Sequence, residues 1–363
     1  MGEYELSSKL RKILKRRSKL GIGDVSVATE ADIQAYNRSE FKQSAFRKLY
    51  HPKTKDIITR TFIIPVTDGA ITGYLFEKVR DKAISGQNSL IVLFHDGGWM
   101  LGNMRKCSAV CSNICNTTGA SVLAVDYRLA PQFKFPIPLE DCYEAFLWAA
   151  QGARYWKVDP DKIYVMGNCA GGNLAAGVSL LARDRKGPKI AGQILISPMT
   201  DGRMRTESYE KFKDCPTLST KTMVHYIQNY SREPKDILDP LFSPLLAKDN
   251  SRLPETLIIT AEFDPLLDDS LLYADALNDA DTPAKCLVCK DTIHSFIDFP
   301  SLDEWKDSMY AISTFIGGRA VSGIEMVSKK DRVKLDRGPH LVCPFCMAIC
   351  ASLYLSRRFL FTK

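Results

Sequence analysis

The chain has 363 residues, of which 45% are hydrophobic and 25% charged, a composition that excludes wholesale disorder and allows one large domain with a full core. The net charge of +7 is concentrated at the ends, because residues 1–20 carry +5 and residues 319–363 carry +6, which leaves −4 on residues 21–318. A mildly acidic body lacks the clustered basic surface that nucleic-acid binding needs, so we expect no nucleic-acid partner.

The eleven cysteines do not indicate a disulfide scaffold. Residues 1–20 are dense in Lys and Arg and contain no apolar stretch of the kind that a secretory signal requires. We therefore expect reduced thiols and a cytoplasmic protein. The sequence leaves the oligomeric state open, with a dimer as one possibility.

Short β-rich runs alternate with helical patterns from about residue 58 onward. The expected strands are residues 59–65, 71–76, 90–95, 121–126, 163–166, 193–197, 256–260 and 285–289, and the expected helices are residues 105–117, 139–151, 172–184, 268–280 and 302–315. Continuous apolar runs alternating with helices predict a mostly parallel eight-stranded sheet with helices on both faces. The first two strands, joined across Thr67–Gly69, are expected to form an antiparallel hairpin.

Two stretches depart from this alternation, and together they predict a helical cap on the carboxyl edge of the sheet. Residues 1–57 form a basic segment in which Leu6, Leu10, Ile13 and Leu14 have helical spacing, and residues 201–250 are an irregular insertion within a body of residues 58–318. The basic face of the first segment is also compatible with weak contact with an anionic membrane surface, although a cap helix is the favoured interpretation.

The tail, residues 319–363, is basic and contains cysteines. Its His340, Cys343, Cys346 and Cys350 resemble part of a zinc site. The second ligand pair of such a site is missing, so we expect no metal.

One turn carries the signature of a nucleophile. Gly167-Asn168-Cys169-Ala170-Gly171 follows a strand and opens a helix, a pattern in which the glycines permit a tight turn that lifts the central side chain above the sheet. Cys169 is the candidate nucleophile, because the corresponding pattern with a central serine, G-x-S-x-G, occurs nowhere in the chain. The backbone N–H of Ala170, at the helix start, is expected to face a developing oxyanion.

A second glycine pair and one histidine complete the candidate site. Gly97 and Gly98 end the strand at residues 90–95, where their N–H groups could complete an oxyanion hole. Of the five histidines, only His294 lies just after the last strand, as a general base should, because His340 lies in the tail and the other three precede that strand. Asp264 is the natural carboxylate to orient it, while Asp268 and Asp269 are weaker candidates because they fall inside the next helix.

Five motifs in this order resemble the hormone-sensitive-lipase family of esterases, within the α/β-hydrolase superfamily. They are His95–Trp99 (family HGGGW), Asp126–Pro131 (DYRLAP), Gly167–Gly172 (GDSAGG), Asp264–Leu266 (DPL) and His294–Phe296 (HGF). The similarity covers about residues 58–315. It implies an α/β-hydrolase fold, a triad that hydrolyses esters of small to medium acyl chains, no cofactor, and a cap built partly from N-terminal helices.

The chain departs from the family pattern at four positions, with Cys169 for Ser, Asn168 for Asp, Asp96 for Gly and Ser295 for Gly. A thiol beside an imidazole at a helix N-terminus can form a reactive thiolate–imidazolium pair, as the similar dienelactone hydrolases suggest. Replacing the adjacent aspartate removes a like charge from such a thiolate, so we hypothesise that the substitutions at residues 168 and 169 are linked. The alternative is a ligand-binding relative without catalysis, as in the gibberellin receptors.

Overall fold

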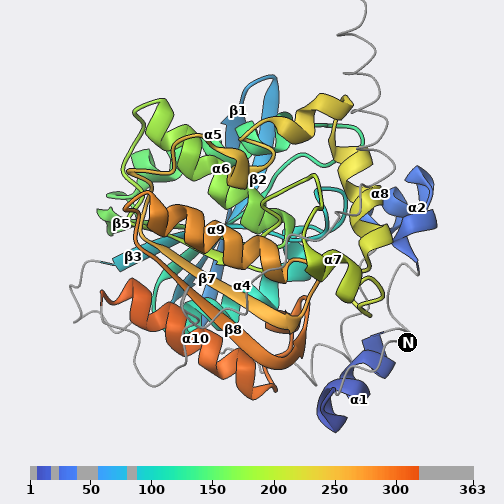
Figure 1. The fold of residues 1–363 in the computed structure, drawn as a ribbon. Helices are drawn as coiled ribbons and strands as arrows, with labels where there is room; N and C mark the ends of the chain where they lie inside the picture. The colour runs from blue at the N-terminus through green and yellow to red at the C-terminus, as the bar shows by residue number, and fades with distance from the viewer. Residues whose placement is uncertain (1–5, 18–23, 39–55, 80–87, 319–363) are drawn as a thin grey trace, which may run out of the picture.

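A computed structural model describes residues 6–17, 24–38, 56–79 and 88–318. Its centre is an eight-stranded sheet in the order β1-β2-β4-β3-β5-β6-β7-β8 (Figure 1). The strands are β1 (Ile57–Val66), β2 (Gly69–Lys78), β3 (Asn88–Phe94), β4 (Ser121–Asp126), β5 (Val158–Asn168), β6 (Gly192–Ile196), β7 (Thr256–Phe263) and β8 (Ala284–Ile293). All eight expected strands are present.

The sheet is parallel except at one edge. β1 and β2 form an antiparallel hairpin in which Val66 pairs with Gly69, and β2 is antiparallel to β4. Every pairing from β4 through to β8 is parallel. The expected hairpin and the expected mostly parallel sheet are therefore both confirmed, and the carboxyl ends of six strands share one edge.

Five helices cover the two faces of the sheet, as the alternation predicts. They are α4 (Met104–Thr118), α5 (Ile137–Gly152), α6 (Ala170–Asp184), α9 (Leu267–Asp279) and α10 (Asp303–Ile316). Successive side chains of a strand point to opposite faces of the sheet and pack in two different apolar clusters. Leu90 and Val92 of β3 pack with residues of α5, α6 and α9 on one face. Ile91 and Leu93 pack with residues of α4 and α10 on the other.

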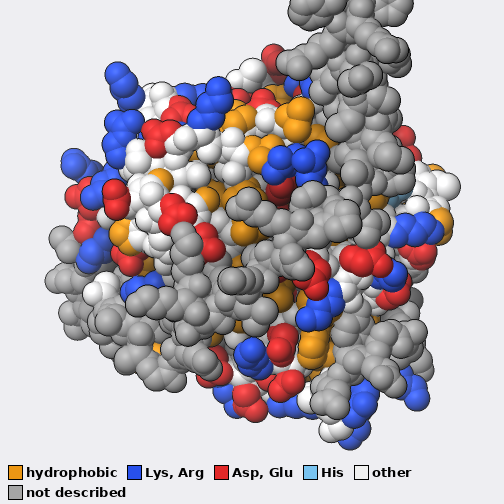
Figure 2. All heavy atoms as spheres, viewed as in Figure 1, with side chains coloured by type: hydrophobic (Ala, Val, Ile, Leu, Met, Phe, Trp, Pro, Cys, Tyr) orange, Lys and Arg blue, Asp and Glu red, His pale blue; other side chains and the backbone are white. Residues whose placement is uncertain are grey.

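The first helix, α1 (Ser8–Arg17), buries the apolar stripe that the sequence predicts. Leu6, Leu10 and Ile13 belong to the cluster that includes α4 and α10, while Lys9 and Arg11 are exposed. No helix among the described residues is long and apolar enough to cross a membrane. On the face in Figure 2, basic and acidic side chains are interspersed.

Helices from the two irregular stretches meet above the loop that follows β3. α2 (Glu30–Arg38) docks through Asn37, whose side chain donates to Met100 O at 2.8 Å and accepts from Gly102 N at 3.0 Å. The short helix η1 (Val25–Val27) contacts α8 (Thr220–Tyr230), and Figure 1 shows α2 beside α8. Residues 25–38 and α8 thus lie close to the loop that follows β3, while the cap and the division of the chain at residues 57 and 318 stay predictions.

One buried ion pair fixes the chain between β4 and α5. Asp141 is fully buried and binds the Arg128 guanidinium through both carboxylate oxygens, the shorter contact being 2.6 Å. It also accepts a hydrogen bond from Arg128 N at 3.0 Å. The neighbouring Glu140 pairs instead with Arg185 in a more exposed position. Arg128 and Asp141 therefore act as a structural pair, as their places at a strand end and a helix start suggest.

These adjacent acids give a matched test of stability. Asp141→Ala is expected to lower the free energy of unfolding by about 3 kcal/mol, because it leaves a largely buried guanidinium unpaired. Glu140→Ala is expected to lower it by less than about 1 kcal/mol, because its ion pair is partly exposed. Chemical denaturation of both variants measures the difference, and equal losses would contradict the assignment of Arg128 and Asp141 as the structural pair.

Candidate active site

The turn between β5 and α6 holds Cys169 in a strained conformation. Its φ of 54° and ψ of −116° are rare for a residue with a side chain. Its N–H donates to Ile196 O of β6 at 2.9 Å, and its carbonyl accepts from Asn173 N in the first turn of α6 at 3.0 Å. The thiol is thereby fixed, buried, at the carboxyl edge of the sheet.

The two glycines that flank this turn are required by close backbone contacts. A Cβ at Gly167 would lie 2.1 Å from Gly171 O, and a Cβ at Gly171 would lie 2.1 Å from Phe94 O. The second contact presses the turn against the end of β3. It therefore also sets the distance between Cys169 and the glycine loop that begins at His95.

An imidazole and a carboxylate come to the same edge from the last two strands. His294 directly follows β8, and its Nδ1 lies 2.8 Å from Asp264 Oδ2. Asp264 follows β7, is fully buried, and accepts a hydrogen bond from Leu266 N at 2.9 Å through its other oxygen. Thr217, from residues 201–250, donates to His294 O at 2.8 Å. The imidazole is thus fixed on both its ring and its backbone.

The environment of His294 favours the charged ring. Burial alone lowers the pKa of the imidazole, because a low-dielectric site disfavours charge. The charge of Asp264 and hydrogen bonds with Asp264 and with the Cys169 side chain outweigh burial, and they raise the pKa well above its ordinary value. The structure therefore brings together Cys169, His294 and Asp264, the three side chains singled out in the sequence.

The glycine loop after β3 presents unused backbone donors. Gly97 and Gly98 have φ values of 104° and 60°, and Gly97 O accepts from Met100 N and Leu101 N at 3.1 and 2.8 Å. Among the described residues, neither glycine N–H donates a hydrogen bond. Ala170 is the first residue of α6, where a helix leaves N–H groups without intrahelical partners.

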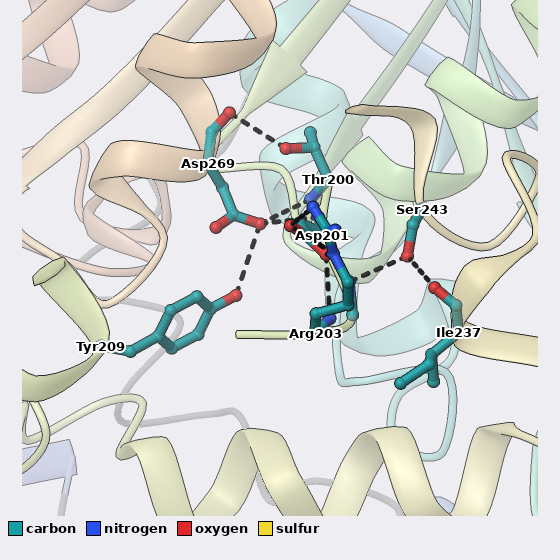
Figure 3. A network of polar contacts seen from close by, with 8 residues as sticks. Thr200, Asp201, Arg203, Tyr209, Ile237, Ser243 and Asp269 are labelled. Carbon is teal, nitrogen blue, oxygen red and sulfur yellow. Dashed lines mark hydrogen bonds and ion pairs between the residues drawn. The ribbon is translucent and has the colours of Figure 1, made fainter. Parts of the chain in front are cut away.

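Asp268 and Asp269 do not orient His294. Asp268 accepts from Ser208 N at 2.9 Å, whereas Asp269 accepts from Thr200 N at 2.7 Å and Asp201 N at 3.0 Å. Figure 3 shows these contacts of Asp269 together with its contact to the Tyr209 hydroxyl. Burial and the nearby Asp201 carboxylate raise the pKa of Asp269 well above its ordinary range. Both acids anchor the start of the 201–250 insertion to α9.

Two contacts of residues 201–250 with the site have no signal in the sequence. Tyr226 of α8 packs on Gly98 so closely that a Cβ there would lie 2.2 Å from its ring. Trp99 stacks on Tyr230 with ring centroids 4.4 Å apart. A helical apolar pattern identifies such side chains as buried, but it does not identify the surface that they cover.

In the described part of the chain, no group of three or more His, Cys, Asp or Glu side chains could hold a metal ion. The tail residues His340, Cys343, Cys346 and Cys350 lie outside the described residues.

An eight-stranded, mostly parallel sheet with a tight nucleophile turn after its fifth strand, followed along the chain by an acid and a histidine, defines the class of α/β hydrolases. The family model described as "alpha/beta hydrolase fold" matches residues 91–298. The chain belongs to this family, in its hormone-sensitive-lipase-like class.

Named relatives and solved structures agree with this assignment. An arylesterase from Saccharolobus solfataricus is 34% identical over 272 residues, which cover 74% of this chain and 87% of the relative. An ethyl acetate hydrolase from Pseudomonas putida is 32% identical and covers 62% of this chain and 71% of the relative. The structure of a hyperthermophilic esterase from Pyrobaculum calidifontis is 32% identical, with a TM-score of 0.77, and covers 86% of this chain and 98% of that one.

The charge of His294 depends on Asp264, which gives a spectroscopic prediction. In the wild-type protein the ring is expected to stay protonated above the ordinary histidine pKa, so its contribution to stability is complete below that value and is lost as the pH rises through the folded-state pKa. Asp264→Asn removes the charge that opposes burial, and the pKa of His294 is expected to fall. Histidine NMR titration measures both proteins, with His294→Gln to assign the signal.

His225 on α8 serves as an internal control in the same spectra. Burial lowers the pKa of His225, and the charge of Asp24 partly offsets this shift. Neither cause involves Asp264, so Asp264→Asn should leave the pKa of His225 unchanged. An unchanged titration of His294 in the variant would contradict the pairing with Asp264.

Proposed function

We propose that this protein is a carboxylic ester hydrolase with a Cys169–His294–Asp264 triad. The observation that supports the proposal is the buried imidazole of His294, which hydrogen bonds to Asp264 at 2.8 Å and whose pKa is raised by Asp264 and by the Cys169 side chain against the effect of burial. The esterase names of the relatives support the same reaction class. A purely ligand-binding site has no need of a strained thiol turn aligned with a charged imidazole.

Acylation begins with attack of Cys169 Sγ on the ester carbonyl carbon. Asp264 hydrogen bonds to Nδ1 of His294, so the other ring nitrogen, Nε2, accepts the proton of the thiol. The C=O electron pair moves to oxygen as the tetrahedral intermediate forms, and the N–H groups of Gly97, Gly98 and Ala170 stabilise that oxyanion. When the intermediate collapses, the C–O bond to the alcohol breaks, the alcohol takes the proton from His294, and a thioester remains.

Deacylation uses the same groups in reverse order. A water molecule gives a proton to His294 and attacks the thioester carbonyl, while the oxyanion again faces the three N–H groups. Collapse breaks the C–S bond, releases the carboxylic acid and leaves the Cys169 thiolate with the proton on His294, as before acylation. Asp264 keeps the imidazole in one orientation and stabilises its charged form in both halves of the reaction.

Substrates of small to medium acyl length fit the surroundings of the glycine loop. Tyr226 rests on Gly98, and Trp99 beside it is fully buried against Tyr230, so bulky side chains already occupy the space next to the loop. One relative is an ethyl acetate hydrolase, which acts on a small ester.

Substitution of the thiol tests the proposal. Cys169→Ala is expected to lower kcat/KM for p-nitrophenyl acetate by on the order of 10³-fold or more, because the nucleophile of a triad is removed. Cys107→Ala is the matched control. Burial and nearby carboxylates raise the pKa of the Cys107 thiol well above its ordinary value, so Cys107 is expected to be unreactive and its loss to leave turnover unchanged. Iodoacetamide should inactivate the wild type and the control alike.

Two results would count against this function. Undiminished turnover by Cys169→Ala would place the nucleophile elsewhere. No turnover of p-nitrophenyl acetate by the wild type, together with no protection of Cys169 from iodoacetamide by the ester, would favour a ligand-binding relative that has lost catalysis.

A further inference from the structure

Two of the departures from the family pattern contact one another beside the nucleophile. Asp96 stands in the glycine loop just before Gly97, and Asn168 immediately precedes Cys169. Asn168 Nδ2 donates to Asp96 Oδ2 at 3.3 Å. The family motifs HGGGW and GDSAGG have Gly and Asp at these two positions. Compared with the family motifs, the chain therefore carries its carboxylate in the glycine loop instead of in the turn between β5 and α6, and the amide of Asn168 contacts that carboxylate.

Beyond this one hydrogen bond, the pair presents an amide oxygen without a donor and a carboxylate without a cationic partner among the described residues. Asn168 Oδ1 is buried and has no hydrogen-bond partner, although a buried amide oxygen is normally paired. Asp96 is half-buried, and none of the ion pairs of the described residues joins it to a Lys or Arg. Among the described residues, Asn168 Oδ1 thus lacks a donor and the neighbouring Asp96 carboxylate lacks a Lys or Arg partner.

The charge of Asp96 also acts on neighbouring buried groups. After burial, the charge of Asp96 is the largest cause that raises the pKa of the Cys107 thiol, and Asp298 and Asp126 act in the same direction. Asp96 also contributes to the raised pKa of the Tyr127 hydroxyl. The carboxylate therefore acts in a region of low dielectric, where its charge is screened little.

We propose that Asp96 and Asn168 form a specificity subsite that selects esters bearing a positively charged ammonium group near the scissile carbonyl. This inference rests on the proposed ester hydrolysis and names its preferred substrate class. An ammonium can donate to Asp96 and to Asn168 Oδ1 at once, and hydrogen bonds between charged groups are short and strong. A neutral alkyl group of the same shape leaves both acceptors unpaired, a loss that active sites use for discrimination.

The identity of residue 168 follows from the same arrangement. An aspartate there would put a second carboxylate within hydrogen-bond distance of Asp96, and the two charges would repel. Asparagine instead donates to Asp96 and holds its carboxylate in place. The substitution at residue 168 is therefore coupled to the substitution at residue 96 through a direct contact.

The test compares two esters of the same shape and different charge. Alanine ethyl ester, at a pH at which its amine is protonated, and neutral ethyl isobutyrate differ only in the replacement of a methyl by an ammonium group. The measured quantity is the ratio of kcat/KM for the charged ester to kcat/KM for the neutral one. The α-ammonium group also activates the ester carbonyl inductively, and this effect is the same for every variant, so the change in the ratio reports the subsite. Asp96→Asn is expected to lower the wild-type ratio by about tenfold.

Asp281→Asn is the matched control, because it removes the same charge from an exposed turn before β8 and should keep the wild-type ratio. Asp96→Gly, which restores the family residue, is a second variant should Asp96→Asn fail to fold, and it is expected to lose the preference as well. Added salt should weaken the preference of the wild type.

An equal ratio in the wild type and both Asp96 variants overturns the subsite while leaving ester hydrolysis intact. Failure of the wild type to hydrolyse either ester or p-nitrophenyl acetate overturns the hydrolase itself, and the subsite with it. The two failures are thus distinguished by turnover of the neutral ester.

Discussion

The close approach of the β5–α6 turn to the end of β3 is the constraint on which the site depends. Only glycine fits at residue 171, because any Cβ would meet Phe94 O, and Cys169 in the same turn has a positive φ that is rare outside glycine. The same contact holds the turn against the end of β3, directly before the loop that contains Gly97 and Gly98. Backbone packing therefore sets the geometry of the nucleophile before any side chain takes part.

The second requirement is a charged imidazole in a buried position. His294 and Asp264 are both buried, and such a pair is tolerated only where each partner satisfies the other. Asp264 and His294 follow the neighbouring parallel strands β7 and β8 and therefore lie at the same edge of the sheet. Thr217 of the insertion donates a hydrogen bond to the His294 carbonyl. The insertion is in turn anchored by Asp269, so the residues above the site and those within it form one connected structure.

Local pattern and chain order sufficed to predict the sheet, its flanking helices and the three residues that meet at its edge. Apolar periodicity gave the strands, and the rule that an acid and then a histidine follow the elbow selected Asp264 and His294. Contacts between distant segments could not be read in this way. The packing of Tyr226 on Gly98 and the bond from Asn168 to Asp96 depend on how two loops lie in space, which no local period encodes.

The central claim is that the Cys169 thiol is a nucleophile toward an ester carbonyl. Intact-mass analysis of the wild-type protein, quenched in acid shortly after mixing with p-nitrophenyl acetate and followed by peptide mapping, tests it most directly. The account predicts a single acetyl group on Cys169 that disappears as the thioester is hydrolysed. An unmodified Cys169, or an acetyl group carried on another residue during turnover, would contradict it.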